Sequence, residues 1–277
     1  MIEALLLPLS FPFMRDAVLV GLMISVPAGL LSCFLVLRGW SLLGDAVSHA
    51  VLPGVVLAYI AGLPLILGAF LAGLGSALLS GWLQGNSRVK QDTVLGVVMS
   101  GMFALGVVLY TWVQTDLHLD HILFGNMLGI APEDLRIAGV LSALIGGVVL
   151  LKWRDLALMA FDPVQARVSG LPLGLLRHGF LAMVAATVVA MLSAVGIILA
   201  VALLIAPGAI AFLLTRRLPV MMATAVAAAA VASTSGVWAS FWLDSAPAPT
   251  IVLVLMIQFL LALTWRNLAT RMAQTRA

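Results

Sequence analysis

The chain has 277 residues, of which 63% are hydrophobic and only 9% are charged. A soluble globular domain usually carries about 25% charged residues, so this composition excludes an ordinary water-soluble protein and favours a bilayer as its solvent. The net charge of +3 does not indicate nucleic-acid binding, because the basic residues are spread along the chain and form no patch.

Consecutive apolar segments predict a bundle of membrane-spanning helices, each needing roughly 20 residues to cross the hydrocarbon core. The segments are continuous and not alternating, which favours helices over a barrel. Only Gly62-Leu63-Pro64 separates the second segment from the third, so the count is eight or nine. The predicted spans are 16–38, 44–62, 63–83, 93–115, 135–151, 179–195, 196–215, 219–240 and 246–265.

The sequence predicts a single all-α integral membrane domain over residues 1–277. The first 15 or so residues contain Pro8 and Pro12 and are expected to form a short interfacial segment. Basic residues favour the cytoplasmic ends of spans. If the loop after the first span is cytoplasmic, all of the 14 basic residues except Arg15 and Arg136 fall on the cytoplasmic side. This arrangement predicts an outside N-terminus and a cytoplasmic C-terminus.

Asp45 and His49 are the candidate metal ligands, because an ionisable side chain at membrane depth is a functional hypothesis by default. Residues four apart share one face of a helix. Their carboxylate and imidazole suit Mn²⁺, Fe²⁺ or Zn²⁺. One chain offers too few ligands, so we expect a dimer to complete the site. The alternative is a structural pair in which Asp45 caps the helix N-terminus.

The hydrophilic stretch 152–179 contains a predicted short helix on the cytoplasmic face. Asp162 and Pro163 are typical of a helix N-cap and first position, and Gly170 of a helix end. They predict a helix of about two turns over Pro163–Ser169. Such a helix could bind a cytoplasmic partner, or it could be an ordinary connecting turn.

Two further features admit two interpretations each. The outer segment 115–135 holds Asp116, His118, Asp120 and His121, which could attract cations to an outer mouth or face a carrier protein, or could simply be solvated loop charge. Pro-Gly pairs at 53–54 and 207–208 lie inside predicted spans. Such pairs often mark a broken or bent helix that lines a cavity.

Several segments resemble the permeases of ABC importers for manganese, zinc and iron. The resemblance covers essentially the whole chain and lies in four segments: Leu37–Gly54 with its RGWSLLGDAVSHAVLPG run, Ile122–Gly129, Phe161–Pro163 and Gly196–Ala209. It implies a type II importer fold and a permease without a catalytic site or a permanently bound cofactor. It also implies location in a bacterial cytoplasmic (inner) membrane.

The resemblance further implies the site residues and the partners. Asp45 and His49 would be the pathway ligands for the transported ion. Residues 161–170, with Phe161, Asp162, Pro163, Arg167 and Gly170, would form the coupling helix. The partners would be a second permease chain, identical or related, a cytoplasmic ABC ATPase dimer, and a periplasmic or lipoprotein metal-binding protein. The run 120–125 and the turn 38–40 are most similar to the manganese and iron branch, with zinc as the alternative.

Two other classes of function fit the sequence less well. A membrane-embedded metalloprotease needs a general base beside its metal, as in H-E-x-x-H, yet Glu3 and Glu133 both lie outside the predicted spans. A channel or secondary transporter would need no ATPase, and the predicted cytoplasmic helix argues against it. No phosphate-binding G-x-x-x-x-G-K-[ST] run is present, so an ATPase would be a separate polypeptide.

Overall fold

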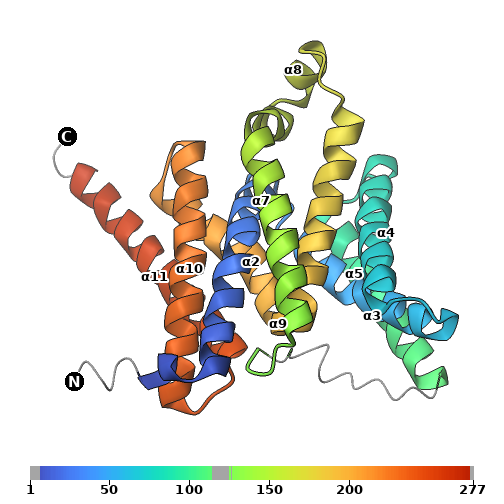
Figure 1. Ribbon diagram of the computed structural model, residues 1–277. Helices are drawn as coiled ribbons and strands as arrows, with labels where there is room; N and C mark the ends of the chain where they lie inside the picture. The colour runs from blue at the N-terminus through green and yellow to red at the C-terminus, as the bar shows by residue number, and fades with distance from the viewer. Residues whose placement is uncertain (1–6, 114–124, 126, 275–277) are drawn as a thin grey trace.

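The computed structural model describes residues 7–113, 125 and 127–274, and all regular structure in these ranges is helical (Figure 1). A single 3₁₀ turn, η1 (Leu7–Ser10), precedes the helices. The α-helices are α2 (Pro12–Arg38), α3 (Leu43–Ala61), α4 (Leu65–Asn86), α5 (Gln91–Trp112), α7 (Pro132–Phe161), α8 (Pro163–Val168), α9 (Leu173–Leu214), α10 (Leu218–Leu243) and α11 (Pro247–Gln274).

Nine stretches of the described residues are long and apolar enough to cross a membrane, which confirms the higher of the two predicted counts. Helix α9 contains two of them, 173–192 and 194–214. Gly196 interrupts α9 with a non-helical backbone (φ 77°, ψ 174°). The break therefore falls at the boundary predicted between spans 179–195 and 196–215. In Figure 1 the second half of α9 runs back toward the end of the bundle where α8 lies.

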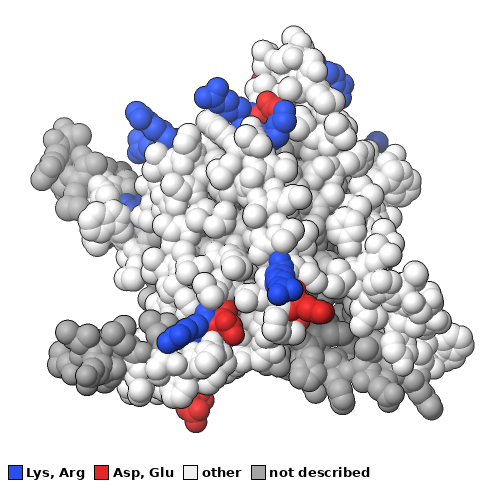
Figure 2. Space-filling model, viewed as in Figure 1, with Lys and Arg blue, Asp and Glu red and all other residues white. Residues whose placement is uncertain are grey.

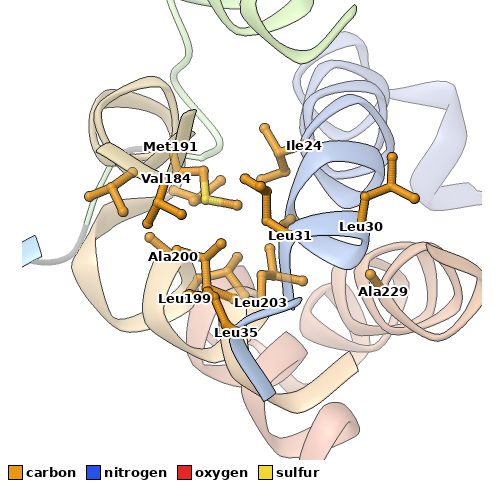
Figure 3. Packing of buried hydrophobic residues seen from close by; sticks show 14 of the residues in the cluster. Ile24, Leu30, Leu31, Leu35, Val184, Met191, Leu199, Ala200, Leu203 and Ala229 are labelled. Carbon is orange, nitrogen blue, oxygen red and sulfur yellow. The ribbon is translucent and has the colours of Figure 1, made fainter. Parts of the chain in front are cut away.

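The bundle is built around α2 and α9. Helices α10 and α11 lie on one flank in Figure 1 and α3, α4 and α5 on the other, with α8 standing out at one end, here called the α8 side. Figure 3 shows Leu31 and Leu35 of α2 against Leu199 and Leu203 of α9, and all four are at most 2% exposed. Because lipid is as apolar as these side chains, close van der Waals packing holds such helices together.

Two helices are longer than the predicted spans. Helix α2 begins at Pro12, so residues 12–14 already belong to it, and Pro12 suits a first turn that needs no N–H donor. Helix α7 continues past the charged residues 152–155 and ends only at Phe161. Charged residues end the apolar part of the helix, but the helical backbone can continue outside the hydrocarbon. The helix ends at Phe161 because Pro163 disfavours helical backbone at the preceding residue, Asp162.

The Pro-Gly pairs lie within continuous helical backbone and mark close helix packing. Of the two predicted alternatives, a broken helix at these pairs is wrong. Helix α3 passes through Pro53 without a non-helical residue. A Cβ atom on Gly54 would lie 2.5 Å from the Cβ atom of Ala72, and one on Gly68 would lie 2.5 Å from that of Ala58. Small residues at this spacing let two membrane helices approach closely.

The second pair behaves in the same way. A Cβ atom on Gly208 would lie 2.5 Å from the carbonyl carbon of Ser32, so the absence of a side chain at Gly208 lets α9 pack closely against α2. Another close glycine contact lies at the break in α9. Gly125 has a left-handed backbone (φ 66°), and a Cβ atom on it would lie 2.5 Å from the carbonyl carbon of Val195. Two segments that resemble the permease family thus meet at glycines.

Two glycines of α4 allow a matched test of the α3–α4 contact. Gly68→Ala is expected to lower the free energy of unfolding by about 1–3 kcal/mol, because the added methyl group overpacks the contact with α3. Gly75→Ala faces open space and is expected to be neutral or stabilising, since alanine is the better helix former. Thermal unfolding in mild detergent measures both. Equal melting temperatures for the two variants would show that the close approach contributes nothing.

Candidate metal-permeation site

Asp45 and His49 lie on α3, where the helical spacing brings them together as predicted. His49 Nε2 lies 3.4 Å from Asp45 Oδ1. Leu42 occupies the N-cap position of α3 and Asp45 lies in the first turn, so the alternative in which Asp45 caps the helix is wrong. An acidic side chain in the first turn still gains from the positive end of the helix dipole.

The pair interrupts a buried stretch of α3 that runs from Leu43 to Val56. The side chains of Asp45 and His49 are 25% and 27% exposed, whereas the residues between them, Ala46, Val47 and Ser48, are at most 1% exposed. Ser48 donates its hydroxyl to the carbonyl of Gly44, 2.8 Å away, and stays on the buried face. Asp45 and His49 are therefore the only partly exposed residues between Leu43 and Val56.

Phe103 of α5 fixes one side of the imidazole. The two rings meet edge to face, with centroids 5.1 Å apart and an interplanar angle of 82°. His49 Nδ1 is buried and has no hydrogen-bond partner among the described residues. Buried polar atoms are nearly always paired, so an unpaired buried nitrogen is unusual for an imidazole. Sequence reasoning missed Phe103, because no sequence signal relates α5 to α3.

The turn before α3 holds the site helix in place. Gly39 has a left-handed backbone (φ 67°), and Trp40 N–H donates to the carbonyl of Leu35, which closes α2 with a Schellman motif. The guanidinium carbons of Arg38 and Arg177 lie 4.8 Å and 5.8 Å from the ring centroid of Trp40. The Arg-Gly-Trp segment therefore anchors the start of α3 to α2 and α9.

The described residues of one chain do not by themselves form a complete metal site. Among the residues that the structure describes, no three His, Cys, Asp or Glu side chains converge. Manganese and iron usually take more ligands than one carboxylate and one imidazole can supply. The possible outer-mouth residues Asp116, His118, Asp120 and His121 lie outside the described residues.

Helix α8 forms as the sequence predicts, over Pro163–Val168. The Asp162 carboxylate accepts a hydrogen bond from Gln165 N–H at 2.8 Å, which caps the first turn. At the other end Gly170 takes a left-handed backbone (φ 78°), and Leu171 N–H donates to the carbonyl of Ala166, again a Schellman motif. Two good caps compensate for the shortness of this helix.

The outward face of α8 is apolar. Ala166 is fully buried, whereas Phe161, Val164 and Val168 are 65%, 74% and 77% exposed. Val164 and Val168 are four residues apart and share one face of α8, whereas Phe161 is the last residue of α7 and precedes the non-helical Asp162. Arg167 is exposed beside them. Figure 2 shows Lys and Arg side chains concentrated along the α8 side, while acidic and basic groups mix at the opposite end.

Comparison with known proteins identifies the family. The model of the ABC 3 transport family matches residues 10–266. The chelated iron transport system membrane protein YfeD of Yersinia pestis is 48% identical over 261 residues, covering 94% of this chain and 88% of that protein. The manganese transport system membrane protein MntC of Halalkalibacterium halodurans is 40% identical, covering 92% of this chain and 87% of that protein.

A solved structure agrees with the fold. PsaBC from Streptococcus pneumoniae in complex with Fab superposes with a TM-score of 0.84 at 34% identity, and the match covers 95% of both chains. The sequence match, the nine apolar helices and the superposition all extend over nearly the whole chain. The chain therefore belongs to the ABC 3 transport family and is a multi-pass membrane permease of the metal-importing type.

Proposed function

We propose that this permease carries Mn²⁺ or Fe²⁺ into the cytoplasm, with Asp45 and His49 as ligands of the transported ion. The observation that carries the proposal is the partly exposed Asp45–His49 pair on an otherwise buried stretch of α3. At about 1.5 Å per residue, His49 lies about 9 Å into the helix. Asp45 lies only about 3 Å into it. A carboxylate and an imidazole on a membrane-spanning helix are costly to leave facing lipid.

This cost is the reason to place a second permease chain against the pair. Two copies facing each other across an axis would offer two carboxylates and two imidazoles to one ion. Covering the face would also remove the polar side chains from lipid. The relatives are named for manganese and for chelated iron, which favours these two ions over Zn²⁺.

The coupling partner in this proposal is an ABC ATPase dimer bound at α8 through Phe161, Asp162, Pro163, Arg167 and Gly170. A periplasmic or lipoprotein metal-binding protein would deliver the ion at the opposite end. The α8 side is then cytoplasmic, in line with its basic residues, and the N-terminus lies outside. The membrane is the cytoplasmic membrane of a bacterium. ATP hydrolysis would alternate access to the site by moving α8 and the helices that carry it.

Reconstitution tests the proposal. We expect proteoliposomes that hold the permease and its ATPase, supplied with loaded carrier protein, to accumulate Mn²⁺ or Fe²⁺ only when ATP is present, and in preference to Zn²⁺. Accumulation at the same rate without ATP would contradict the proposal and indicate a channel or secondary transporter. A preference for Zn²⁺ would contradict the assigned ion while leaving the importer mechanism intact.

A further inference from the structure

A groove of about 580 Å³ runs along the surface between α2, α7 and α10. Val26 and Leu30 of α2, Leu150 and Trp153 of α7, and residues of α10 from Pro219 to Ala230 line it, and every lining side chain is apolar. Between Pro219 and Ala230, α10 rises by about 16 Å. This is about half of a 30 Å hydrocarbon core, so the groove has the depth of one leaflet.

Basic side chains gather at the α8-side end of this groove. Arg154 directly follows Trp153 in α7, and Arg216 and Arg217 directly precede α10. All three are exposed, and none makes an ion pair within the described part of the chain. Figure 2 shows basic groups along this edge, above a white face of uncharged residues.

Trp153 marks the level at which the groove meets the headgroup region. The Arg154 guanidinium carbon lies 5.4 Å from the ring centroid of Trp153, and tryptophan is enriched at this level of membranes. By contrast, Lys152 Nζ lies 3.2 Å from Asp155 Oδ2, so this carboxylate already partly neutralises the charge of Lys152. The surface thus joins an apolar trough one leaflet deep to three uncompensated positive charges.

We propose that this surface binds one anionic phospholipid of the leaflet on the α8 side. One acyl chain lies in the groove, and the phosphate lies among Arg154, Arg216 and Arg217. Basic pockets between helix ends are the surfaces that anionic headgroups occupy. A protein partner would not explain why the groove is as deep as one leaflet. A zwitterionic lipid carries no net negative charge to offset the three guanidinium groups. The proposal requires only that the nine helices span a bilayer.

Native mass spectrometry of the purified full-length permease tests this proposal, with phosphatidylglycerol and phosphatidylcholine offered in equal amounts. We expect retention of one phosphatidylglycerol in preference to phosphatidylcholine. Arg154→Gln and Arg217→Gln should each reduce that retention about fivefold, the effect of one basic residue near an anionic surface. Ala223→Phe, at an exposed position in the groove, should reduce retention while leaving the arginines in place.

Arg88→Gln is the matched control, because Arg88 is an exposed basic residue between α4 and α5, far from the groove in sequence. It should leave retention unchanged. An equal loss in Arg88→Gln would overturn the site in favour of diffuse surface charge, and unchanged retention in Arg154→Gln and Arg217→Gln would overturn the headgroup assignment. If Ala223→Phe instead abolished association between two permease chains without changing lipid retention, the groove would belong to a protein contact. Thermal unfolding confirms that each variant is folded before its lipid is counted.

Discussion

Asp45→Asn is expected to abolish metal uptake while the permease remains folded and bound to its ATPase. The substitution keeps the shape of the side chain and removes the charge that would attract the ion in the proposed function. The loss should be at least about 100-fold, because removing even a group that only supports a metal ligand costs 10–100-fold in affinity. His49→Ala should have a comparable effect, since it removes the other proposed ligand and leaves Phe103 without its ring contact.

Uptake of radioactive Mn²⁺ by cells that express the intact transporter measures both variants. Ser48→Ala is the control, because Ser48 lies between the two ligands but is fully buried and bonds only within its own helix. We expect its uptake to be close to that of the wild type. If Asp45→Asn and Ser48→Ala both transported normally, Asp45 would not be a ligand, whatever the fold.

Most of the helical arrangement follows from the sequence, because the bilayer imposes it. A span needs about 20 apolar residues, so the apolar run 179–215 has to turn near its middle. The turn occurs at Gly196, at the boundary that span length alone predicts. The helix ends are less predictable. Hydropathy ends the fifth span at residue 151, but α7 continues to Phe161, since hydrogen bonding along a helix does not depend on the solvent around its side chains.

Tertiary contacts are the part that the sequence did not reveal. The Pro-Gly pair at 53–54 suggested a broken helix, whereas the useful signal was the small-residue spacing of Gly54 with Ala58 and of Gly68 with Ala72. The pairing of Asp45 with His49 was predictable, because it depends only on helix periodicity. The contact between His49 and Phe103 was not, because it depends on which helix packs against α3.

The second large effect is expected at α8. Val164→Asp and Val168→Asp should each weaken binding of the ATPase at least about thirtyfold, the effect of losing a residue that dominates a protein interface. Both side chains are more than 70% exposed and contribute little to the fold of this chain. Exposed apolar clusters of this kind on a surface facing water indicate a protein contact, and a carboxylate placed among them would be buried without a partner.

Co-purification of the ATPase in mild detergent and metal uptake by cells give independent measurements of this effect. Leu243→Asp is the matched control, since Leu243 is 67% exposed and ends α10 at the end of the bundle opposite α8 (Figure 1). It should retain the ATPase. Loss of the ATPase together with loss of uptake in the α8 variants would support coupling through this helix. Loss of the ATPase with normal uptake would show that transport needs no ATP, and the Asp45–His49 pair would then belong to a channel or secondary transporter.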